Sequence, residues 1–532
     1  MNAGPQTSDA LNHAWKKTCT LLFGEDIGDL EGYSTWLSGL IDTNMIKKSS
    51  ISGKNVAFSV KEYAPDSKWI SFDEIDFNKK FEPLNINEIK DMDSIVEAIS
   101  DRNYYCGNII LGNSAYIERC SNLTDCFYAS DSAQYTNSKY IAFCTVGRDS
   151  SYCFGVHGPG DTDFCIRCTQ TFNVKRSFEL WVRQNCSDCY YVYDLDSCSN
   201  CLFSFHLRNK NYCIGNLELD RDKYLKIKNK LSSELVEELK KHKSLPSLLD
   251  IMKKSKHDAL KLDFQGQREE KLDKTIVEKG FSGTTRILFG KKLSGMDDYE
   301  KWLTAHSHKM LERRSVISGK KILFLPYITA LVMADESLAN RIVTAEEAIV
   351  IGEKFKVSPA EAEAMTLKNV HESIGKLAYV NVDFRIGECS NLVDCSVAYA
   401  SSNCYRASAI VSSKDCGCGM WPKDSTNCFG FDTLFDSSFC INCYHSVKLS
   451  RCFELDACRN CSDSYFSHNC ENVHDSMFCF NTKNAKHALG NAQLEPTKYK
   501  GIKQALLEQI AEELEDKKNL KWNIYNIGCE KS

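Results

Sequence analysis

The chain has 532 residues, with 66 basic and 71 acidic side chains and a formal net charge of −5. This length suits three or four domains, and 43% hydrophobic residues is the proportion of a globular protein. So small a net charge provides no overall field for nucleic acid or an anionic membrane. No stretch approaches the roughly 20 apolar residues of a membrane span, and the N-terminal residues lack the apolar core of a secretory signal, so we expect a cytoplasmic protein.

The expected cytoplasmic location determines the redox state of the 27 cysteines. Cytoplasmic reductants keep cysteines as thiols, whereas a secreted protein would oxidise them. The odd number also excludes complete pairing within one chain. We therefore expect free thiols rather than a disulfide framework.

The two halves of the chain carry the same pattern, which indicates a tandem duplication. Leu22-Phe23-Gly24 recurs as Leu288-Phe289-Gly290, and Phe164-Cys165-Ile166 recurs, at an offset of 275, as Phe439-Cys440-Ile441. Matching positions in the two halves divide the chain into corresponding segments. The predicted segments are an α/β leader and cap at 1–103, a Cys-rich repeat at 104–217, a helical closing segment and linker at 218–283, a second leader and cap at 284–386, a second Cys-rich repeat at 387–491, and a C-terminal helix and tail at 492–532.

Each leader is predicted to combine helices with a strand. In the second leader, 321–325 has the composition of a strand, and 345–376 has that of a helix with a break at Pro359. Its counterpart at 88–99 is expected to lie across the first turn of the repeat that follows it. There it would cover an open strand edge, as the caps of repeat proteins do.

Both repeats are built on a cysteine at every twelfth residue. Ser replaces it at some steps, as at Ser177, and the next residue is large and apolar, as in Cys428-Phe429. An Asn or Asp before the cysteine favours a bend, because these residues tolerate left-handed backbone. The ladder cysteines are Cys153, Cys165, Cys189, Cys201 and Cys213 in the first repeat and Cys404, Cys416, Cys428, Cys440 and Cys452 in the second.

Short strands and regular corners at a fixed period predict a mainly β fold with α caps: two parallel β-solenoids, each with an α/β leader and a charged C-terminal helix. A twelve-residue turn would have room inside only for Cys, Ser or Ala. The position after each ladder cysteine holds Phe, Tyr, Leu or Ile, so we favour 24 residues per turn, with 12 as the alternative. The ladder thiols are then structural fillers of the corners, which agrees with their exchange for Ser.

The closing segments at 220–243 and 497–518 are amphipathic and rich in Lys and Glu, so we predict helices that cover the far ends of the repeats or reach a partner. The linker also has apolar residues at helical spacing, which an inert tether would not need. We therefore predict one connected body whose working surface is shared by the two copies. The apolar linker residues are Leu245, Leu248, Leu249, Ile251 and Met252.

Two stretches of the first copy, 185–191 (Asn-Cys-Ser-Asp-Cys-Tyr-Tyr) and 207–216 with Tyr224, carry a family resemblance. They resemble a large group of Cys-rich repeat proteins of unknown function, encoded by uncultivated prokaryotes with small genomes. The likeness extends over the first repeat and its closing helix and is looser in the second copy. The paired C-x-x-C zinc ribbon with which many of those proteins begin is not found in this sequence. The resemblance implies a parallel β-solenoid, and it implies no activity and no catalytic residues.

Several C-x-x-C pairs raise the alternative of a structural metal protein with zinc or an iron–sulfur cluster. Their spacing is that of the repeat itself, and the offset of 275 places Ser464 opposite Cys189. We therefore prefer a packing role and predict no metal and no cofactor, with zinc as the alternative. The metal candidates are Cys186, Cys189, Cys198, Cys201, Cys458 and Cys461.

A further alternative is a carbohydrate-active enzyme on a β-helix. The Gly- and Pro-rich stretch 157–163 differs from its counterpart at 432–438, and His157 and Asp161 are its candidate residues. The same composition is typical of a plain turn, and no general acid or nucleophile stands beside it. We predict no enzyme and no catalytic residues.

The function we predict is a noncatalytic scaffold or binding protein that presents an extended solenoid surface to protein partners or to copies of itself. Nucleic acid is not an expected partner. Adjacent rings in one strand alternate in direction, so one of each pair must face outward, where aromatic residues favour interfaces. The alternative is that helices of the same chain cover the rings. The candidate binding residues are Tyr190, Tyr191, Tyr193, Tyr465, Phe466 and Trp421, together with His157 and Asp161.

Overall fold

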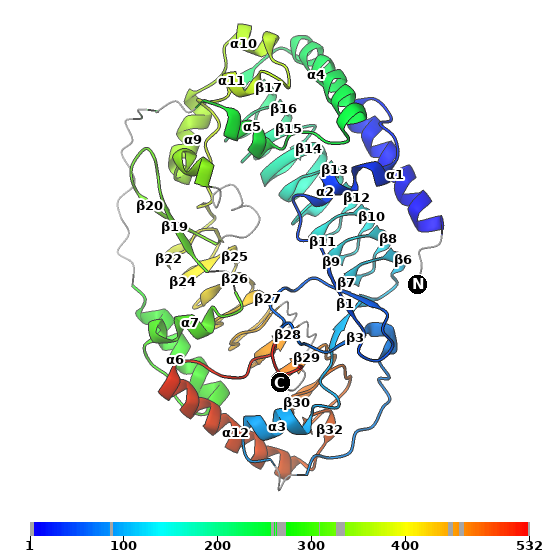
Figure 1. Ribbon diagram of the computed structural model, residues 1–532. Helices are drawn as coiled ribbons and strands as arrows, with labels where there is room; N and C mark the ends of the chain where they lie inside the picture. The colour runs from blue at the N-terminus through cyan, green and yellow to red at the C-terminus, as the bar shows by residue number, and fades with distance from the viewer. Residues whose placement is uncertain are drawn as a thin grey trace.

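A computed structural model describes residues 5–85, 89–256, 260, 262, 273–307, 309–325, 336–444, 451–456 and 462–529. The fold is rich in parallel strands, with helices at the ends of each half (Figure 1). The described elements follow the same order in both halves: helices, an antiparallel pair of strands, further helix, a long series of short strands and a closing helix. Within the described residues, no helix has both the length and the apolar composition to cross a membrane.

The first half begins with α1 (Pro5–Phe23) and α2 (Ser34–Ser38) and ends with α4 (Arg221–His242) and α5 (Leu248–Lys254). We call the strands β4 to β18 stack 1. Before stack 1 come β1 (Met45–Lys48), β2 (Asn55–Phe58), β3 (Trp69–Ser71) and α3 (Met92–Ala98). Stack 1 comprises β4 (Tyr105–Gly107), β5 (Ile110–Leu111), β6 (Ala115–Glu118), β7 (Ser121–Thr124), β8 (Phe127–Ser130), β9 (Ala133–Thr136), β10 (Lys139–Ala142), β11 (Thr145–Arg148), β12 (Ser151–Phe154), β13 (Gly160–Ile166), β14 (Thr169–Ser187), β15 (Tyr190–Tyr193), β16 (Ser199–Leu202), β17 (Asn211–Ile214) and β18 (Leu217–Glu218).

The second half begins with α6 (Thr275–Phe289) and α7 (Glu300–Leu303) and ends with α12 (Pro496–Lys517). The expected strand at 321–325 is confirmed, and the expected break before Pro359 is also present, but the predicted helix over 345–376 is interrupted a second time, between Ala364 and Val370. These segments correspond to β20 (Lys321–Phe324), which pairs with β19 (Leu311–Arg314), and to α9 (Ala345–Lys354), α10 (Pro359–Ala364) and α11 (Val370–Ser373). Stack 2 comprises β21 (Arg385–Ile386), β22 (Ser390–Val393), β23 (Ala398–Tyr399), β24 (Ser402–Ser408), β25 (Ile410–Val411), β26 (Gly417–Lys423), β27 (Asp432–Phe435), β28 (Phe453–Asp456), β29 (Ser462–His468), β30 (His474–Met477), β31 (Ala488–Leu489) and β32 (Ala492–Gln493).

Most neighbouring strands of a stack are parallel, with residue i paired to residue i + 12, whereas the last pair of each stack, β17–β18 and β31–β32, is antiparallel. Cys153 pairs with Cys165 in stack 1, and Phe453 pairs with Tyr465 in stack 2. One turn of the chain therefore takes twelve residues, and the favoured turn of 24 residues is wrong. That estimate assumed that the large residue after each ladder cysteine lies inside the turn, which it does not.

The backbone turns a corner at every third residue. The angle φ is positive at Asn173, Arg176 and Glu179, and the same period of three runs through most of both stacks. A twelve-residue turn thus has four corners rather than the one that the Asn or Asp before each cysteine indicated. Left-handed φ costs roughly 1 kcal/mol or more at a residue with a Cβ, and Asn and Asp tolerate it best. One corner column of stack 2 accordingly carries Asn391, Asn403, Asp415 and Asn427.

The residue that follows each corner points into the stack, where space is narrow. Cys428 Sγ donates to the carbonyl of Thr426 (3.5 Å), and Ser177 Oγ makes the same contact two residues back, to Lys175 (3.1 Å). The Ser177 hydroxyl also accepts from the backbone N–H of Cys189 in the next turn (3.3 Å). A small side chain with a polar atom therefore fills the corner and satisfies backbone groups, which explains why Cys and Ser exchange there.

Larger side chains enter the interior beside a glycine. A Cβ on Gly147 would lie 2.4 Å from the ring of Tyr135, the residue twelve positions earlier. In stack 2, a Cβ on Gly419 would lie 2.6 Å from the ring of Phe431. Each ring thus occupies the space that a side chain in the neighbouring turn would need.

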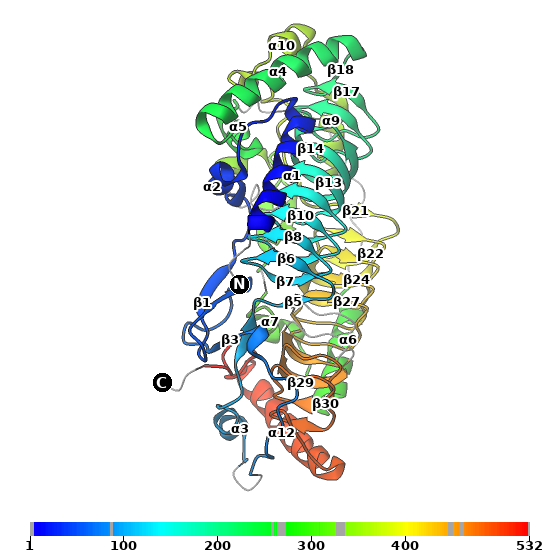
Figure 2. The same ribbon diagram turned by 90° about the vertical axis from the view of Figure 1, so that its right-hand side faces the viewer.

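The large residue after each ladder cysteine faces away from the interior and packs under helices. Phe154 contacts Trp15 of α1 (ring centroids 5.2 Å apart), and Phe178 contacts Phe23 of the same helix (5.4 Å). Figure 2 shows α1 running along the strands of stack 1. The apolar core of each half is therefore double: a narrow interior of Cys, Ser and small apolar residues, and a broad outer layer beneath the helices.

The end of each stack packs against the other half of the chain. The N–H of Val357, before α10, donates to Gly215 O at the end of stack 1 (2.9 Å). Arg102, after α3, donates to Gly490 O at the end of stack 2 (3.0 Å), where Ile99 also packs. The expectation that 88–99 covers the first turn of its own repeat is wrong, because Ile95 and Ile99 belong to the core that contains Leu489.

The two junctions between the halves are equivalent. In each, side chains near the end of one stack bond to backbone atoms just before, or in the first strand of, the other stack, and the paired positions differ by 275 residues. The halves therefore close head to tail into one body. The linker analysis predicted one connected body but not this arrangement. The four hydrogen bonds are Tyr193 Oη to Asn381 O (2.5 Å) and His206 Nε2 to Tyr379 O (3.0 Å) at junction 1, and Cys106 N to His468 Nε2 (2.8 Å) and Asn481 Nδ2 to Tyr104 O (2.7 Å) at junction 2.

Candidate functional site

A cavity of about 760 Å³ lies between the two stacks. Its walls consist mainly of two columns of side chains in each stack, with successive members twelve residues apart. The columns of stack 2 are those of stack 1 displaced by 275 positions. The lining residues of stack 1 include Asn122, Thr124, Gln134, Thr136, Val146 and Arg148, and those of stack 2 include Val397, Tyr399, Ala409, Val411, Trp421 and Lys423.

The two walls differ in polarity although they are built in the same way. Gln134 and Thr136 on stack 1 correspond to Ala409 and Val411 on stack 2. A ligand in this cavity would meet amide and hydroxyl groups on one side and aliphatic and aromatic groups on the other. Such a lining, mostly apolar with a few polar groups, is typical of sites for small organic molecules.

The Gly- and Pro-rich stretch 157–163 is part of the wall of stack 1 and not a separate catalytic loop. His157 is 1% exposed, contacts Thr145 Oγ1 through Nδ1 (2.7 Å), and burial lowers its pKa to about 3. Asp161 is exposed and lies outside the cavity lining, whereas Gly158, Pro159 and Gly160 line it. His157 and Asp161 therefore do not form a catalytic pair, and the stretch contributes small residues that widen the cavity.

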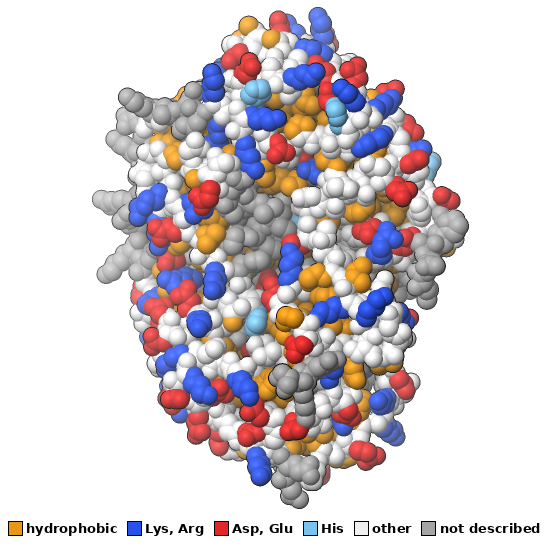
Figure 3. Space-filling view, viewed as in Figure 1, with side chains coloured by type: hydrophobic (Ala, Val, Ile, Leu, Met, Phe, Trp, Pro, Cys, Tyr) orange, Lys and Arg blue, Asp and Glu red, His pale blue; other side chains and the backbone are white. Residues whose placement is uncertain are grey.

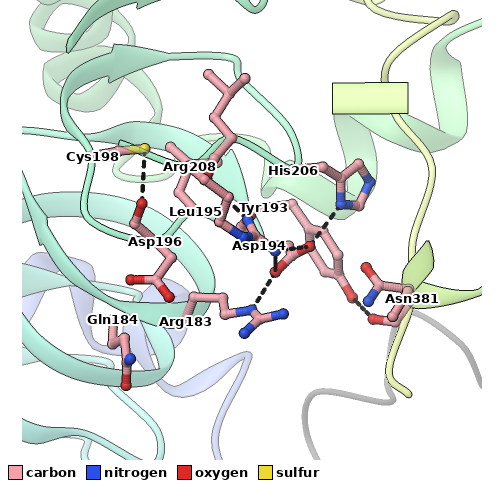
Figure 4. Close-up of polar contacts among 12 residues, drawn as sticks. Arg183, Gln184, Tyr193, Asp194, Leu195, Asp196, Cys198, His206, Arg208 and Asn381 are labelled. Carbon is pink, nitrogen blue, oxygen red and sulfur yellow. Dashed lines mark hydrogen bonds and ion pairs between the residues drawn. The ribbon is translucent and has the colours of Figure 1, made fainter. Parts of the chain in front are cut away.

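A buried ionic cluster lies at junction 1 (Figure 4). The carboxylate of Asp194 is bound by Arg183 Nε (2.6 Å), Arg208 (2.9 Å) and His206 Nδ1 (2.9 Å). Burial opposes the charge of Asp194, but the hydrogen bond from His206 and the charges of the two arginines hold its pKa well below its usual range. Arg183 also lines the cavity and lies over the ring of Phe384 (4.4 Å).

The geometry of His206 assigns it a structural role. One ring nitrogen faces the carboxylate of Asp194 and the other faces Tyr379 O, so both nitrogens have an acceptor within the protein. At junction 2, His468 Nδ1 faces Asp456 (3.2 Å) while Nε2 accepts from the N–H of Cys106, which makes that ring neutral. In both residues each nitrogen already has a protein partner, so neither is placed to exchange a proton with a ligand.

A second pair of buried acids differs between the halves. Glu179 accepts from the N–H of Leu248 (3.0 Å) and forms an ion pair with Arg167 (2.6 Å). The equivalent Glu454 accepts from the N–H of Ile524 (2.8 Å), but Asn442 replaces the arginine. Burial raises the pKa of Glu454 to about 8, so this carboxyl is protonated at neutral pH.

The orientation of Asn442 agrees with a protonated Glu454. The amide is satisfied when its nitrogen donates to Gly430 O (3.1 Å) and its oxygen accepts from Trp302 Nε1 (3.3 Å). That oxygen then faces Glu454 Oε1 at 3.4 Å. Two acceptors would repel each other at this distance, whereas a protonated carboxyl donates to the amide.

No family model, curated protein or solved structure matches this chain.

The tyrosines and phenylalanine predicted as a binding surface are not accessible. Tyr190, Tyr191 and Tyr193 are at most 4% exposed, and Tyr465 and Phe466 at most 2%. Their hydroxyl groups, where present, bond to backbone carbonyls within the chain. The expectation of an exposed aromatic surface is wrong because helices and the opposite half cover these rings, whereas Trp421 is half-buried and lines the cavity. The hydroxyl partners are Leu22 O for Tyr190, Pro246 O for Tyr191, Asn381 O for Tyr193 and Leu288 O for Tyr465.

The cysteines that the structure describes are all free, and nearly all are buried. Cys186 and Cys189 lie close enough for thiol contact, yet both also donate to backbone carbonyls, Gln184 O (3.2 Å) and Ser187 O (3.2 Å). A thiolate would face those oxygens unfavourably. In the described part of the chain no three metal-ligating side chains form a metal site. Cys198 and Cys201 make the same carbonyl contacts, and Cys458 and Cys461 lie outside the described residues.

Sequence reasoning missed Arg148, Phe172 and Lys423, all of which line the cavity. The available signal was the offset of 275, which places Lys423 opposite Arg148. A 24-residue turn does not place these residues in one column, so the offset alone did not indicate a shared wall. The twelve-residue turn aligns each of them with the other members of its column.

Proposed function

We propose that this chain is a noncatalytic binding protein in which two parallel β-solenoids, closed into one body, hold a small ligand in the cavity between them. The observation that carries the proposal is the cavity itself. Its volume of about 760 Å³ falls within the range of about 300–1,000 Å³ that ligand sites usually have. Both halves contribute a wall, which gives the duplication a purpose that one copy could not serve.

The assignment of both stacks as β-solenoids is supported by the constant parallel register of twelve residues and by corners of period three. Such stacks are stiff, because every turn bonds to the next. Two stiff walls joined at both ends preserve an open space without ligand, so that binding requires little ordering of the protein.

A partner surface on the outside of the molecule has less support. The large rings of the repeats lie under helices, and on the face in Figure 3 basic and acidic side chains are interspersed. Catalysis also has little support, because the two acids that line the cavity already have partners within the protein: Asp149 accepts from Asn137, and Glu471 pairs with Lys483. A general acid or base must be free to reach the reacting atom.

The test is native mass spectrometry of the purified chain, followed by denaturation and identification of any released compound. A thermal-shift screen against a metabolite library should run in parallel. We expect one small molecule per chain, or a class of compounds that raises the Tm. Two variants fill the cavity from opposite walls, Gly160→Val and Val411→Trp, and both should abolish binding. If no compound binds, or if binding survives both variants, the proposal is wrong.

A further inference from the structure

Positive charge is the feature that both walls of the cavity share. Arg148 and Lys423 are equivalent positions at the offset of 275, and both line the cavity. Other positions in the same columns differ in chemistry between the two stacks. For example, Thr136 on stack 1 corresponds to Val411 on stack 2. Among the described positions that line the cavity in both stacks, only this pair keeps a charge.

Two other cations that line the cavity, Arg183 and Lys483, are neutralised within the protein. Arg183 forms an ion pair with Asp194 (2.6 Å), and Lys483 forms one with Glu471 (2.7 Å). No ion pair or side-chain hydrogen bond joins the Arg148 guanidinium to another residue in the described part of the chain. The Arg148 guanidinium therefore keeps its donors available to the cavity.

Asp149, the acid next to Arg148, also lines the cavity but is not bonded to the guanidinium. Asp149 Oδ1 accepts from Asn137 Nδ2 (2.8 Å), the residue twelve positions earlier in its own corner column. Arg148 instead flanks Gly160, which lies directly below it in the next turn. An anion that enters the cavity would thus meet a guanidinium with donors to spare.

Gly160 separates the guanidinium from an aromatic ring. A Cβ on Gly160 would lie 3.7 Å from Arg148 Nε and 2.9 Å from Phe172 Cδ2, so both groups border the space that the glycine leaves. Phe172 is 46% exposed, an unusual value for a phenylalanine inside a cavity wall. A flat ring stacked on Phe172 would cover that apolar surface and place its substituent near Arg148.

We propose that the cavity binds a small organic anion that carries a flat ring, with its carboxylate or phosphate on Arg148 and its ring on Phe172. Lys423 and Trp421 on the opposite wall provide the same two chemistries, a cation and a ring, two positions apart. The inference rests on the proposed binding function and specifies the ligand class.

The experiment uses probes matched in shape and different in charge. Indole-3-acetate is compared with indole-3-acetamide, AMP with adenosine, and inorganic phosphate serves as an anion without a ring. Isothermal titration calorimetry is performed on the full chain and on Arg148→Gln, Phe172→Ala and Gly160→Val. Lys139→Gln is the charge control, because Lys139 is exposed and lies outside the cavity lining.

We expect at least one charged ring probe to bind ten-fold or more tightly than its neutral match. Arg148→Gln should remove that difference, which is the usual effect of losing one charge-assisted hydrogen bond, and Phe172→Ala should weaken both members of the pair. The carboxylate and phosphate probes distinguish the two sources of charge. Equal affinity for charged and neutral probes, or no change in Arg148→Gln, would overturn the anionic class. If neutral compounds bind and Gly160→Val blocks them, the binding function stands while the ligand class is wrong. If no probe and no library compound binds, both proposals are wrong.

Discussion

Replacing Glu454 by Gln should make the protein more stable at alkaline pH. The pKa of Glu454 is raised from 4.5 to about 8 by burial. Between these values the folded state holds a proton that the unfolded state has released, so stability falls as pH rises from about 4.5 to about 8 and is constant above that. The difference in pKa corresponds to at most about 5 kcal/mol. Gln cannot ionise, so Glu454→Gln should lose none of this stability.

The equivalent acid in the first half is the matched control. Glu179 forms an ion pair with Arg167, whose side chain is 5% exposed. Glu179→Gln would leave a buried guanidinium without its anion, which typically costs about 3–5 kcal/mol. The two substitutions are chemically identical and are placed at equivalent positions, yet we expect opposite effects above pH 8.

The assay is the Tm of the unmodified chain and of both variants from pH 5 to pH 9. Burial also raises the pKa of Asp383 to about 7, so part of the slope should persist in Glu454→Gln. The expected result is a flatter profile for Glu454→Gln that meets the unmodified protein near pH 5, and a profile for Glu179→Gln that lies several degrees lower throughout. An unchanged slope in Glu454→Gln, or a lower Tm at pH 9, would refute the argument that Glu454 is an unpaired acid.

Two other predictions concern the ladder and the junctions. Cys428→Ser should lower the free energy of unfolding by about 1 kcal/mol, because Ser makes the same carbonyl contact. Phe429→Ala should lower it by about 3 kcal/mol or more, because it leaves a cavity beneath α6. Denaturant titration of both variants checks this order, and the reverse order would indicate a metal or a disulfide at the ladder. Limited proteolysis should not cut early within 245–252, because Leu248 and Met252 are fully buried. Early cleavage there with release of two separately stable halves would contradict the finding that each leader packs against the end of the other half's stack.

The period, the parallel pairing and the burial of the linker could all be predicted because each is a local pattern. A cysteine at every twelfth residue requires a repeat of that length, and apolar residues at helical spacing, such as Leu245 and Leu248, require a surface to cover them. The size of the turn could not be predicted from strand alternation. Alternation has a period of two, whereas a left-handed residue at every third position gives side chains a period of three. Cys428 and Phe431, which are three positions apart, therefore both face inward, where alternation would place them on opposite sides.

The cavity could not be predicted from the sequence. It exists only if the leader of each copy covers the end of the other copy's stack and not a stack end of its own copy. In a duplicated chain, the end of stack 1 and the end of stack 2 present the same kind of surface, so a leader finds similar contacts within its own copy and in the other. Sequence order favours the nearer end. The structure has the exchanged arrangement, in which Ile99 packs at Gly490 and Val357 bonds to Gly215. Only this exchange holds the two stacks side by side and sets Arg148 and Lys423 on opposite walls of one space. The candidate site is therefore a property of the closed pair, and each half alone contains one wall of it.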